Sequence, residues 1–197
     1  QKNNQNYLKV SKEEKAIFNA TIKTIISQGD NTNGLLGQGV NTAPTAFGYV
    51  TFPETVTATD LYSGFDFAYA IGSNGKVWTW GNNSDGQLAK DSTLIASANS
   101  PILAILPLGT TPRIWGINNN RISFFDSDGV SVYSGTYKGG WVVASLPYGF
   151  NNRTDFVNVS LYHVQYNSGN TSYAYVNAGI GLTSGGELFG HNTAVGN

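Results

Sequence analysis

The sequence contains no cysteine and no methionine, and charged residues make up only 12% of its 197 positions. Without cysteine, the chain can form neither a disulfide bond nor a thiolate-based zinc site or nucleophile. Lys and Arg number 11 against 12 Asp and Glu, which gives a net charge of −1. This balance argues against nucleic-acid binding, which needs a basic surface. Runs of about 18 apolar residues are also absent, so we expect no membrane span.

Neutral polar and small residues take the place of charge. Glycine occurs 24 times and asparagine 22 times, while aromatic residues make up 13% of the chain. The surface is therefore expected to be polar, weakly charged and rich in turns. A chain of this length has room for one domain or a short repeat array, and it can bury a core without disulfides or metals.

The first thirty residues carry the signals of a helix. Ser11 and Glu14 form a capping box, and Gly29 stands where a left-handed C-cap is common. The spacing predicts an amphipathic helix from Lys12 to about Gln28, which packs on the rest of the domain, forms a stalk or docks a partner. We therefore divide the chain into a helical segment, 1–29, and a β-repeat domain, 30–197. The apolar side of the helix consists of Ile17, Phe18, Ile22, Ile25 and Ile26.

After Asp30 the pattern changes to short β-branched and aromatic runs separated by Gly, Asn, Asp and Pro. Such runs are typical of an all-β domain. Three hairpins are expected, within 68–80, 121–133 and 173–189, each with a turn that ends in glycine. The turns are Gly72–Gly75, Asp126–Gly129 and Thr183–Gly186.

The hairpins recur at a regular step. Their last turn glycines, Gly75, Gly129 and Gly186, are 54 and 57 residues apart. Residues 33–37 match 85–89 at a step of 52. Residues 50–53 match 104–107 at a step of 54, and 143–147 look like a third copy of this apolar segment that ends in proline, only 40 residues later. The spacing predicts three to four antiparallel units of about fifty residues, as in a β-propeller or another stacked β array.

One unit carries a specific motif. Tyr69–Leu88 reads YAIGSNGKVWTWGNNSDGQL, which resembles the repeat of the regulator of chromosome condensation family, whose core is G-x-V-[WY]-x-W-G-x-N-x-x-G-Q-L. The resemblance is specific over 62–107 and weaker elsewhere in 30–197. It implies that the structural core of the repeat consists of Gly75, Trp78, Trp80, Gly81, Asn83, Gly86 and Leu88.

The same resemblance implies a seven-bladed β-propeller, a family in which nucleotide exchange on a small GTPase is a known activity. Seven units of about fifty residues need about 350 residues, whereas 30–197 supplies fewer than four units. We therefore expect an incomplete or degenerate propeller-like array. It can be a fragment, share a ring with other chains, or have diverged into a β domain that is not a closed ring.

Residues that could carry catalysis are sparse. His163 and His191 lie in dissimilar contexts, and Asp126–Gly129 lacks the closing Glu of a calcium loop. Sequence alone brings no two of the scattered carboxylates into the pair that a glycosidase needs. We therefore expect no enzymatic activity, no cofactor and no metal. The carboxylates considered are Glu54, Asp60, Asp66, Asp91, Asp155 and Glu187.

Binding is better supported, because several aromatic residues fall in loops rich in Gly and Asn. Aromatic faces beside neutral amides can hold a saccharide or a protein surface. The candidate ligand-binding residues are Tyr137, Trp141, Tyr148, Asn151, Asn152 and Arg153.

Low charge, abundant Asn and Gly and the absence of Cys and Met favour an extracellular or virion-surface recognition protein, such as a phage tail-fibre or spike tip or a bacterial adhesin. Its partners are then expected to be a cell-surface glycan or protein receptor and other copies or neighbouring chains of an assembly. Three alternatives remain open. They are a pilin-like filament subunit, an intracellular β-propeller scaffold that binds a small GTPase or another protein, and a glycan hydrolase.

Overall fold

The computed structural model describes residues 25–42, 47–118, 120–129, 131–136, 138–145, 155–168 and 171–192. Within these ranges the chain is almost entirely β, and no helix there has the length and apolarity of a membrane span. The elements are β1 Ile26–Ser27, a 3-10 turn η2 Thr32–Gly34, β2 Gly48–Tyr49, β3 Ala58–Ser63, β4 Phe67–Gly72, β5 Val77–Asn82, β6 Ser97–Ala104, β7 Pro112–Asn118, β8 Arg121–Asp126, β9 Ser131–Gly135, β10 Trp141–Ser145, β11 Phe156–Ser168, β12 Thr171–Thr183 and β13 Leu188–Asn192.

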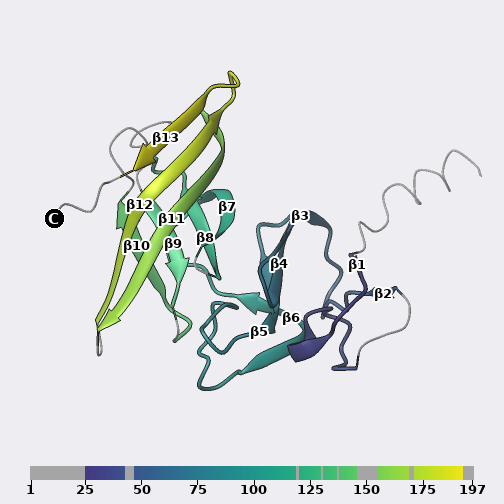
Figure 1. The fold of residues 1–197 in the computed structure, drawn as a ribbon. Coiled ribbons are helices and arrows are strands. Elements are labelled where there is room, and N and C mark those ends of the chain that lie inside the picture. The colour runs from purple at the N-terminus through teal and green to yellow at the C-terminus, as the bar shows by residue number, and fades with distance from the viewer. Residues whose placement is uncertain are drawn as a thin grey trace, which may run out of the picture.

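The strands form separate antiparallel sheets that follow chain order. We call β3-β4-β5-β6 blade 1, β7-β8-β9-β10 blade 2 and β11-β12-β13 blade 3, while β1 and β2 form an N-terminal pair. Figure 1 shows these units succeeding one another, with the N-terminal pair at one end of the molecule and blade 3 at the other. The expected fold class, a propeller-like array of three to four antiparallel units, is confirmed.

The three predicted hairpins form, and their turns are built alike. Gly75, Gly129 and Gly186 adopt φ values of 76°, 75° and 84°, a left-handed conformation that glycine reaches without a Cβ clash. In each turn the serine N–H also donates a hydrogen bond to the carbonyl oxygen of the residue that directly precedes the first strand of its blade. These bonds join Ser73 to Thr57 O, Ser127 to Thr111 O and Ser184 to Asp155 O. The three turns are therefore equivalent positions of one repeat.

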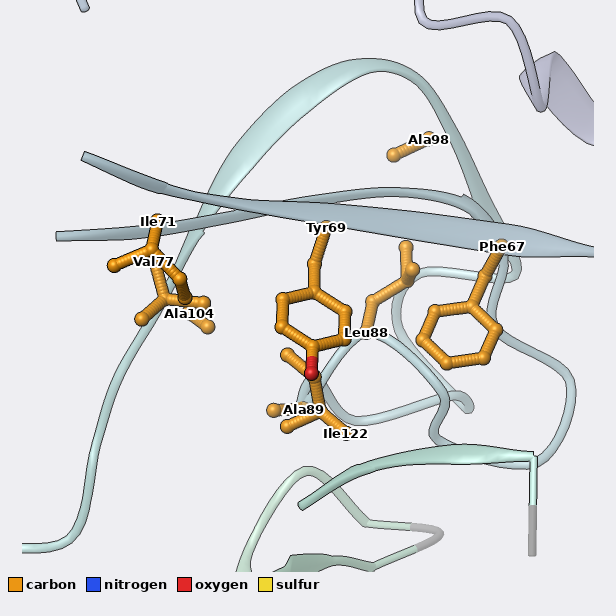
Figure 2. Packing of buried hydrophobic residues seen from close by; sticks show 9 residues of the cluster. All are labelled: Phe67, Tyr69, Ile71, Val77, Leu88, Ala89, Ala98, Ala104 and Ile122. Atoms are coloured by element: carbon orange, nitrogen blue, oxygen red, sulfur yellow. The ribbon is translucent and has the colours of Figure 1, made fainter. Parts of the chain in front are cut away.

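Blade 1 is buried on both faces. Successive side chains of β4 point to opposite sides, and every residue of this strand is buried. Phe67, Tyr69 and Ile71 of β4 join a cluster with Leu88 and with Ile122 of blade 2. Figure 2 shows the rings of Phe67 and Tyr69 pointing from β4 toward Ile122. On the other face, small side chains make room for a tryptophan. There Ala68 and Ala70 pack with Trp80 and Val50, which follows the N-terminal pair.

The N-terminal pair is the second half of a further unit. Ser27 Oγ donates to Leu36 O at 2.7 Å, as Thr79 Oγ1 donates to Leu88 O at 3.0 Å in blade 1. Ser27 and Thr79 are 52 residues apart, and so are Leu36 and Leu88. Strands β1 and β2 thus correspond to the third and fourth strands of a blade.

Loop length explains the irregular step of 40 residues. The connection from β5 to β6 spans 83–96, whereas that from β9 to β10 spans only 136–140. The third apolar segment, 143–147, therefore follows the second after fewer residues.

The predicted N-terminal helix lies outside the described residues except at its end. There the prediction is wrong: Ile26 and Ser27 form a strand that pairs with Tyr49 and Gly48. Pairing with β2 outweighs the local helical pattern, because backbone hydrogen bonds across strands stabilise the extended form.

Candidate functional site

Of the six residues expected to bind a ligand, only Trp141 is described. Its indole N–H donates to Ile105 O at 2.8 Å, and its ring lies 5.4 Å from the Phe124 ring. The side chain is half-buried between blades 1 and 2, against the cluster around Tyr69. Tyr137, Tyr148, Asn151, Asn152 and Arg153 lie outside the described residues.

The residues that the resemblance assigns to the repeat core lie inside blade 1 or in its turns. Trp78, Trp80, Asn83 and Leu88 are all buried. Gly81 has φ 100°, and a Cβ there would lie 2.7 Å from Phe67 Cα. Gly75 and Gly86 also adopt positive φ, 76° and 78°.

Asn83 organises the long loop of blade 1. Leu88 N–H donates to Asn83 Oδ1 at 2.9 Å, while Asn83 Nδ2 donates to Lys90 O and Ile95 O at 3.1 and 2.7 Å. The loop in turn contacts blade 2, where Arg121 Nε donates to Asp85 O at 2.7 Å.

Asn31 repeats this arrangement in the N-terminal pair, and the sequence reasoning missed it. Its Oδ1 accepts from Leu36 N–H at 3.0 Å and its Nδ2 donates to Val40 O at 2.7 Å. The step of 52 residues that relates 33–37 to 85–89 also relates Asn31 to Asn83, and this was the signal that could have identified it.

A cavity of about 430 Å³ lies where the first strands of the three blades meet. Strand β7 contacts both β3 and β11, so side chains from all three blades share one wall. We call this cavity the inner-strand pocket. Its lining includes Asp60 and Tyr62 of β3, Arg113 and Trp115 of β7, Ser123 of β8, and Val157–Val159 of β11.

Aromatic side chains build the wall between blades 1 and 2. Tyr62 stacks on Tyr69 at 4.8 Å, and Trp115 lies 6.1 Å from Tyr69. The Tyr69 hydroxyl donates to Gly116 O at 2.8 Å, which ties β4 to β7. Burial raises the pKa of Tyr69 well above its usual range, with smaller contributions from Tyr62 and Asp60. Burial, assisted by Asp60, also raises the pKa of Tyr62. Both phenols are therefore neutral at physiological pH.

The two ionic groups of the pocket stand on neighbouring blades. The Arg113 guanidinium lies 4.7 Å from the centre of the Phe125 ring, close enough for a cation–π interaction. Asp60 is exposed to solvent. The pocket thus offers a guanidinium, a carboxylate, a phenol and an indole on a rigid sheet framework, a set suited to binding a polar and partly apolar surface.

The search for a metal centre is negative for the described residues. No group of three or more His, Asp or Glu side chains among them could hold a metal ion. Several candidate carboxylates have local structural roles, since Glu54 pairs with Lys76 at 2.6 Å and Asp66 accepts from Asn82 at 2.6 Å. Asp126–Gly129 forms a hairpin turn, and Thr111 N–H donates to Asp126 at 2.6 Å. His163 and His191 fall on β11 and β13, and their side chains are not among those described.

Comparison with known families identifies the repeat. Residues 58–87 match the family model of the regulator of chromosome condensation (RCC1) repeat. The E3 ubiquitin-protein ligase HERC2 of Mus musculus is 33% identical over 98 residues, and that of Homo sapiens is 32% identical over the same length. Each match covers 45% of this chain but only 2% of HERC2. The sequence resemblance to RCC1-type repeats is confirmed.

Solved structures show the same fold. Yeast RCC1 (Prp20) bound to Kap60 aligns with a TM-score of 0.53 and 14% identity, covering 86% of this chain and 39% of that one. Prp20p from Saccharomyces cerevisiae, in a structure reported with its binding to Gsp1p and histones, gives 0.53 and 16%, covering 86% and 41%. Human WBSCR16 gives 0.50 and 14%, covering 85% and 42%. The chain therefore spans about two fifths of these proteins.

These matches correct the expected function. An extracellular or virion-surface protein that binds a cell-surface glycan or receptor is the wrong interpretation, and so is a pilin-like filament subunit. The RCC1 repeat at 58–87, the HERC2 relatives and the RCC1 structures agree instead with the alternative of a β-propeller scaffold. The reason for the error is physical: low charge and many Asn and Gly residues describe a turn-rich surface, and such a surface is compatible with either location.

Proposed function

We propose that this chain is a non-enzymatic, intracellular scaffold of RCC1-type blades that binds a protein, with a small GTPase as the partner. The observation that carries the proposal is the inner-strand pocket. Blades 1 and 2 place aromatic and ionic side chains in its lining, and blade 3 adds Val157, Asn158 and Val159. Rigid sheets hold these side chains before a partner arrives, which lowers the entropic cost of binding.

The chemistry of the pocket suits a protein surface. Aromatic residues and arginine are enriched at the centres of protein interfaces, because they combine a large apolar area with directed hydrogen bonds. Tyr62, Trp115 and Arg113 provide these groups, and Asp60 provides an exposed carboxylate for a basic side chain of the partner. Among the relatives, Prp20p is described with binding to Gsp1p and histones, which supports a protein partner for the same fold.

Binding of the purified chain to small GTPases tests the proposal. Titration calorimetry would compare the GDP-bound, GTP-bound and nucleotide-free forms, with core histones as a second protein class. We expect saturable binding of a small GTPase, and at least a fivefold weaker affinity for Asp60→Asn, corresponding to roughly 1 kcal/mol.

Glu54→Gln is the matched control, because Glu54 is also an exposed carboxylate but pairs with Lys76 away from the pocket. It should leave the affinity unchanged. If no GTPase form binds, or if the two variants lose affinity equally, the proposed partner or the proposed surface is wrong. Binding of histones alone would replace the GTPase by a basic protein partner.

A further inference from the structure

The sequence contains two Asn-Gly pairs, Asn33-Gly34 and Asn74-Gly75. An asparagine before glycine is prone to deamidation, because glycine has no side chain that blocks attack of its backbone nitrogen on the asparagine side chain. Both pairs lie in turns of the described structure. Their surroundings differ, and the difference distinguishes a reactive pair from a protected one.

The pair at 74–75 lies in the open hairpin turn of blade 1. Asn74 and Gly75 are both exposed to solvent, and a Cβ built on Gly75 would have nothing within 4 Å. The Gly75 N–H donates to Gly72 O at 2.9 Å within the same turn. Because hydrogen bonds in an exposed turn open locally at small cost, the Gly75 nitrogen becomes accessible without unfolding of the blade.

The Asn74 side chain is folded back over this turn. Its Oδ1 accepts a hydrogen bond from Lys76 N–H at 3.0 Å. A Cβ built on Gly72 would lie only 2.7 Å from the same oxygen. The hydrogen bond to Lys76 spans the Gly75 peptide, so it holds the side-chain carbonyl beside the nitrogen that would attack it.

The pair at 33–34 is enclosed by its neighbours. Gly34 is buried, and a Cβ there would lie 2.7 Å from Asn99 Cβ. The Gly34 N–H donates to Asn31 O at 3.0 Å, and the Asn31 side chain accepts from Leu36 N–H across the same loop. Close packing leaves the Gly34 peptide little room to turn toward the Asn33 side chain.

We infer that Asn74 is a site of spontaneous modification, at which the hairpin turn of blade 1 acquires an isoaspartate. The Gly75 nitrogen loses its proton to hydroxide and forms a bond to Asn74 Cγ, while the bond from Cγ to the side-chain nitrogen breaks and ammonia leaves. Water then opens the cyclic imide at either carbonyl carbon, which gives aspartate or isoaspartate. Water is the only co-reactant, and the step involves neither oxidation nor reduction.

Blade 2 shows which of the two products alters the turn. Asp128 stands at the equivalent position, and its Oδ1 accepts from Ser131 N–H at 2.9 Å, so an aspartate fits this turn. Isoaspartate instead carries the main chain through the side-chain carboxyl group and lengthens the backbone by one carbon atom. We expect this change to displace the turn and weaken the bond of 2.8 Å from Ser73 N–H to Thr57 O.

Incubation of the purified full chain near pH 8, followed by peptide mass mapping, tests the inference. Fragment ions assign the reaction to residue 33 or 74, and methylation by an isoaspartyl methyltransferase with labelled S-adenosylmethionine distinguishes isoaspartate from aspartate. In the folded chain we expect deamidation of Asn74 to be faster than that of Asn33 by about tenfold or more, because only the open turn reaches the reactive geometry often. The rate at Asn74 should rise in proportion to hydroxide concentration, since the attacking nitrogen must lose a proton.

Unfolding provides the matched control in the same chain. In concentrated urea both pairs are exposed, so their rates should agree to within about twofold. Asn74→Asp is the control for the product, because it adds the charge without lengthening the backbone. Hydrogen exchange of the amides of 73–76 should be about fivefold faster in the isoaspartate form and unchanged in Asn74→Asp.

Equal rates at Asn33 and Asn74 in the folded chain would overturn the inference, and so would reaction of Asn74 in urea alone. Equal exchange in the isoaspartate form and in Asn74→Asp would overturn the assigned effect on the turn. Residues 72–76 do not line the inner-strand pocket. The inference is therefore independent of the proposed GTPase, and failure of one leaves the other standing.

Discussion

Blade 1 and blade 3 carry the same hairpin, but only blade 1 is packed on both faces. Every residue of β4 is buried, whereas Ile180 and Leu182 of β12 are 60% and 37% exposed. The turns are equivalent down to the serine N–H bond. The difference therefore arises from the neighbours: blade 1 lies between the N-terminal pair and blade 2, and blade 3 ends the described array. A blade of this type is stabilised largely by what packs against it.

The loops between the third and fourth strands provide part of that packing. The loop 83–96 contacts blade 2 through Asp85 and Arg121, and the loop 30–42 contacts blade 1 because Trp80 Nε1 donates to Leu35 O at 2.9 Å. Blade 2 has only the short connection 136–140 at this position. Each long loop thus joins its own unit to the next unit along the chain.

The most direct test of the comparison is truncation of the equivalent residues Ile71 and Leu182. Ile71→Ala leaves a cavity between blades 1 and 2 and should lower the free energy of unfolding by about 2–5 kcal/mol. Leu182→Ala should cost less than about 1 kcal/mol, because the side chain is partly exposed already. Urea denaturation followed by tryptophan fluorescence measures both. Equal losses would show that blade 3 is covered in solution.

Removal of the Asn83 amide should have the next largest effect. Asn83→Ala leaves Leu88 N–H and two loop carbonyls without their partner, and we expect a loss of about 2–4 kcal/mol. Asn31→Ala removes the same kind of bonds at the end of the array. It should open only the N-terminal pair, with a global loss below about 1 kcal/mol. Amide hydrogen exchange separates local from global opening, and a global loss as large as that of Asn83→Ala would contradict the distinction.

Alkaline pH should weaken the contact between blades 1 and 2 through Tyr69. Burial raises the pKa of this phenol in the folded state, whereas in the unfolded state it ionises near its usual pKa of about 10. Its contribution to stability is therefore complete below about pH 10 and is lost as the pH rises further, by about 1.4 kcal/mol per pH unit. Urea titrations between pH 9 and 11 measure the slope. Tyr69→Phe should remove this part of it, and an unchanged slope in that variant would exclude Tyr69 as the source.

A smaller effect than those of Ile71, Asn83 and Tyr69 is expected for the hydroxyl that links β5 to its own loop. Thr79 Oγ1 donates to Leu88 O at 3.0 Å in a fully buried position. Thr79→Val keeps the shape and removes the donor, so we expect a loss of about 1 kcal/mol in thermal or urea denaturation. Ser27→Ala, at the equivalent position of the N-terminal pair, should affect only exchange of amides in 25–50. A global loss there equal to that of Thr79→Val would show that the pair unfolds together with blade 1.

Much of the fold could be predicted because its signals are local. The turns that end in Gly75, Gly129 and Gly186 each need one residue in the left-handed conformation, which glycine supplies. A glycine between two β-branched or aromatic runs is visible in the sequence. The helix predicted up to Gln28 was wrong at its end, where Ile26 and Ser27 pair with β2. A helical pattern does not show strand-pairing partners that lie more than twenty residues away, so long-range hydrogen bonding overrode the local preference.

The inner-strand pocket could not be predicted, because no motif marks it. Asp60, Arg113 and Val157 come from three different repeats and meet only when the blades stack. Trp141 shows the opposite problem. Its setting beside two glycines indicated an open binding loop, and the structure places its indole N–H against Ile105 O.

By itself the sequence determined the repeat, its hairpins and their turns, because turn geometry and strand alternation depend on residues close together in the chain. Only the tertiary structure decided which apolar faces are buried. Ile71 and Leu182 stand at the same repeat position with similar side chains, yet one is 7% exposed and the other 37%. Burial is a property of what lies opposite a side chain, and for stacked blades the opposite surface belongs to another unit of the array.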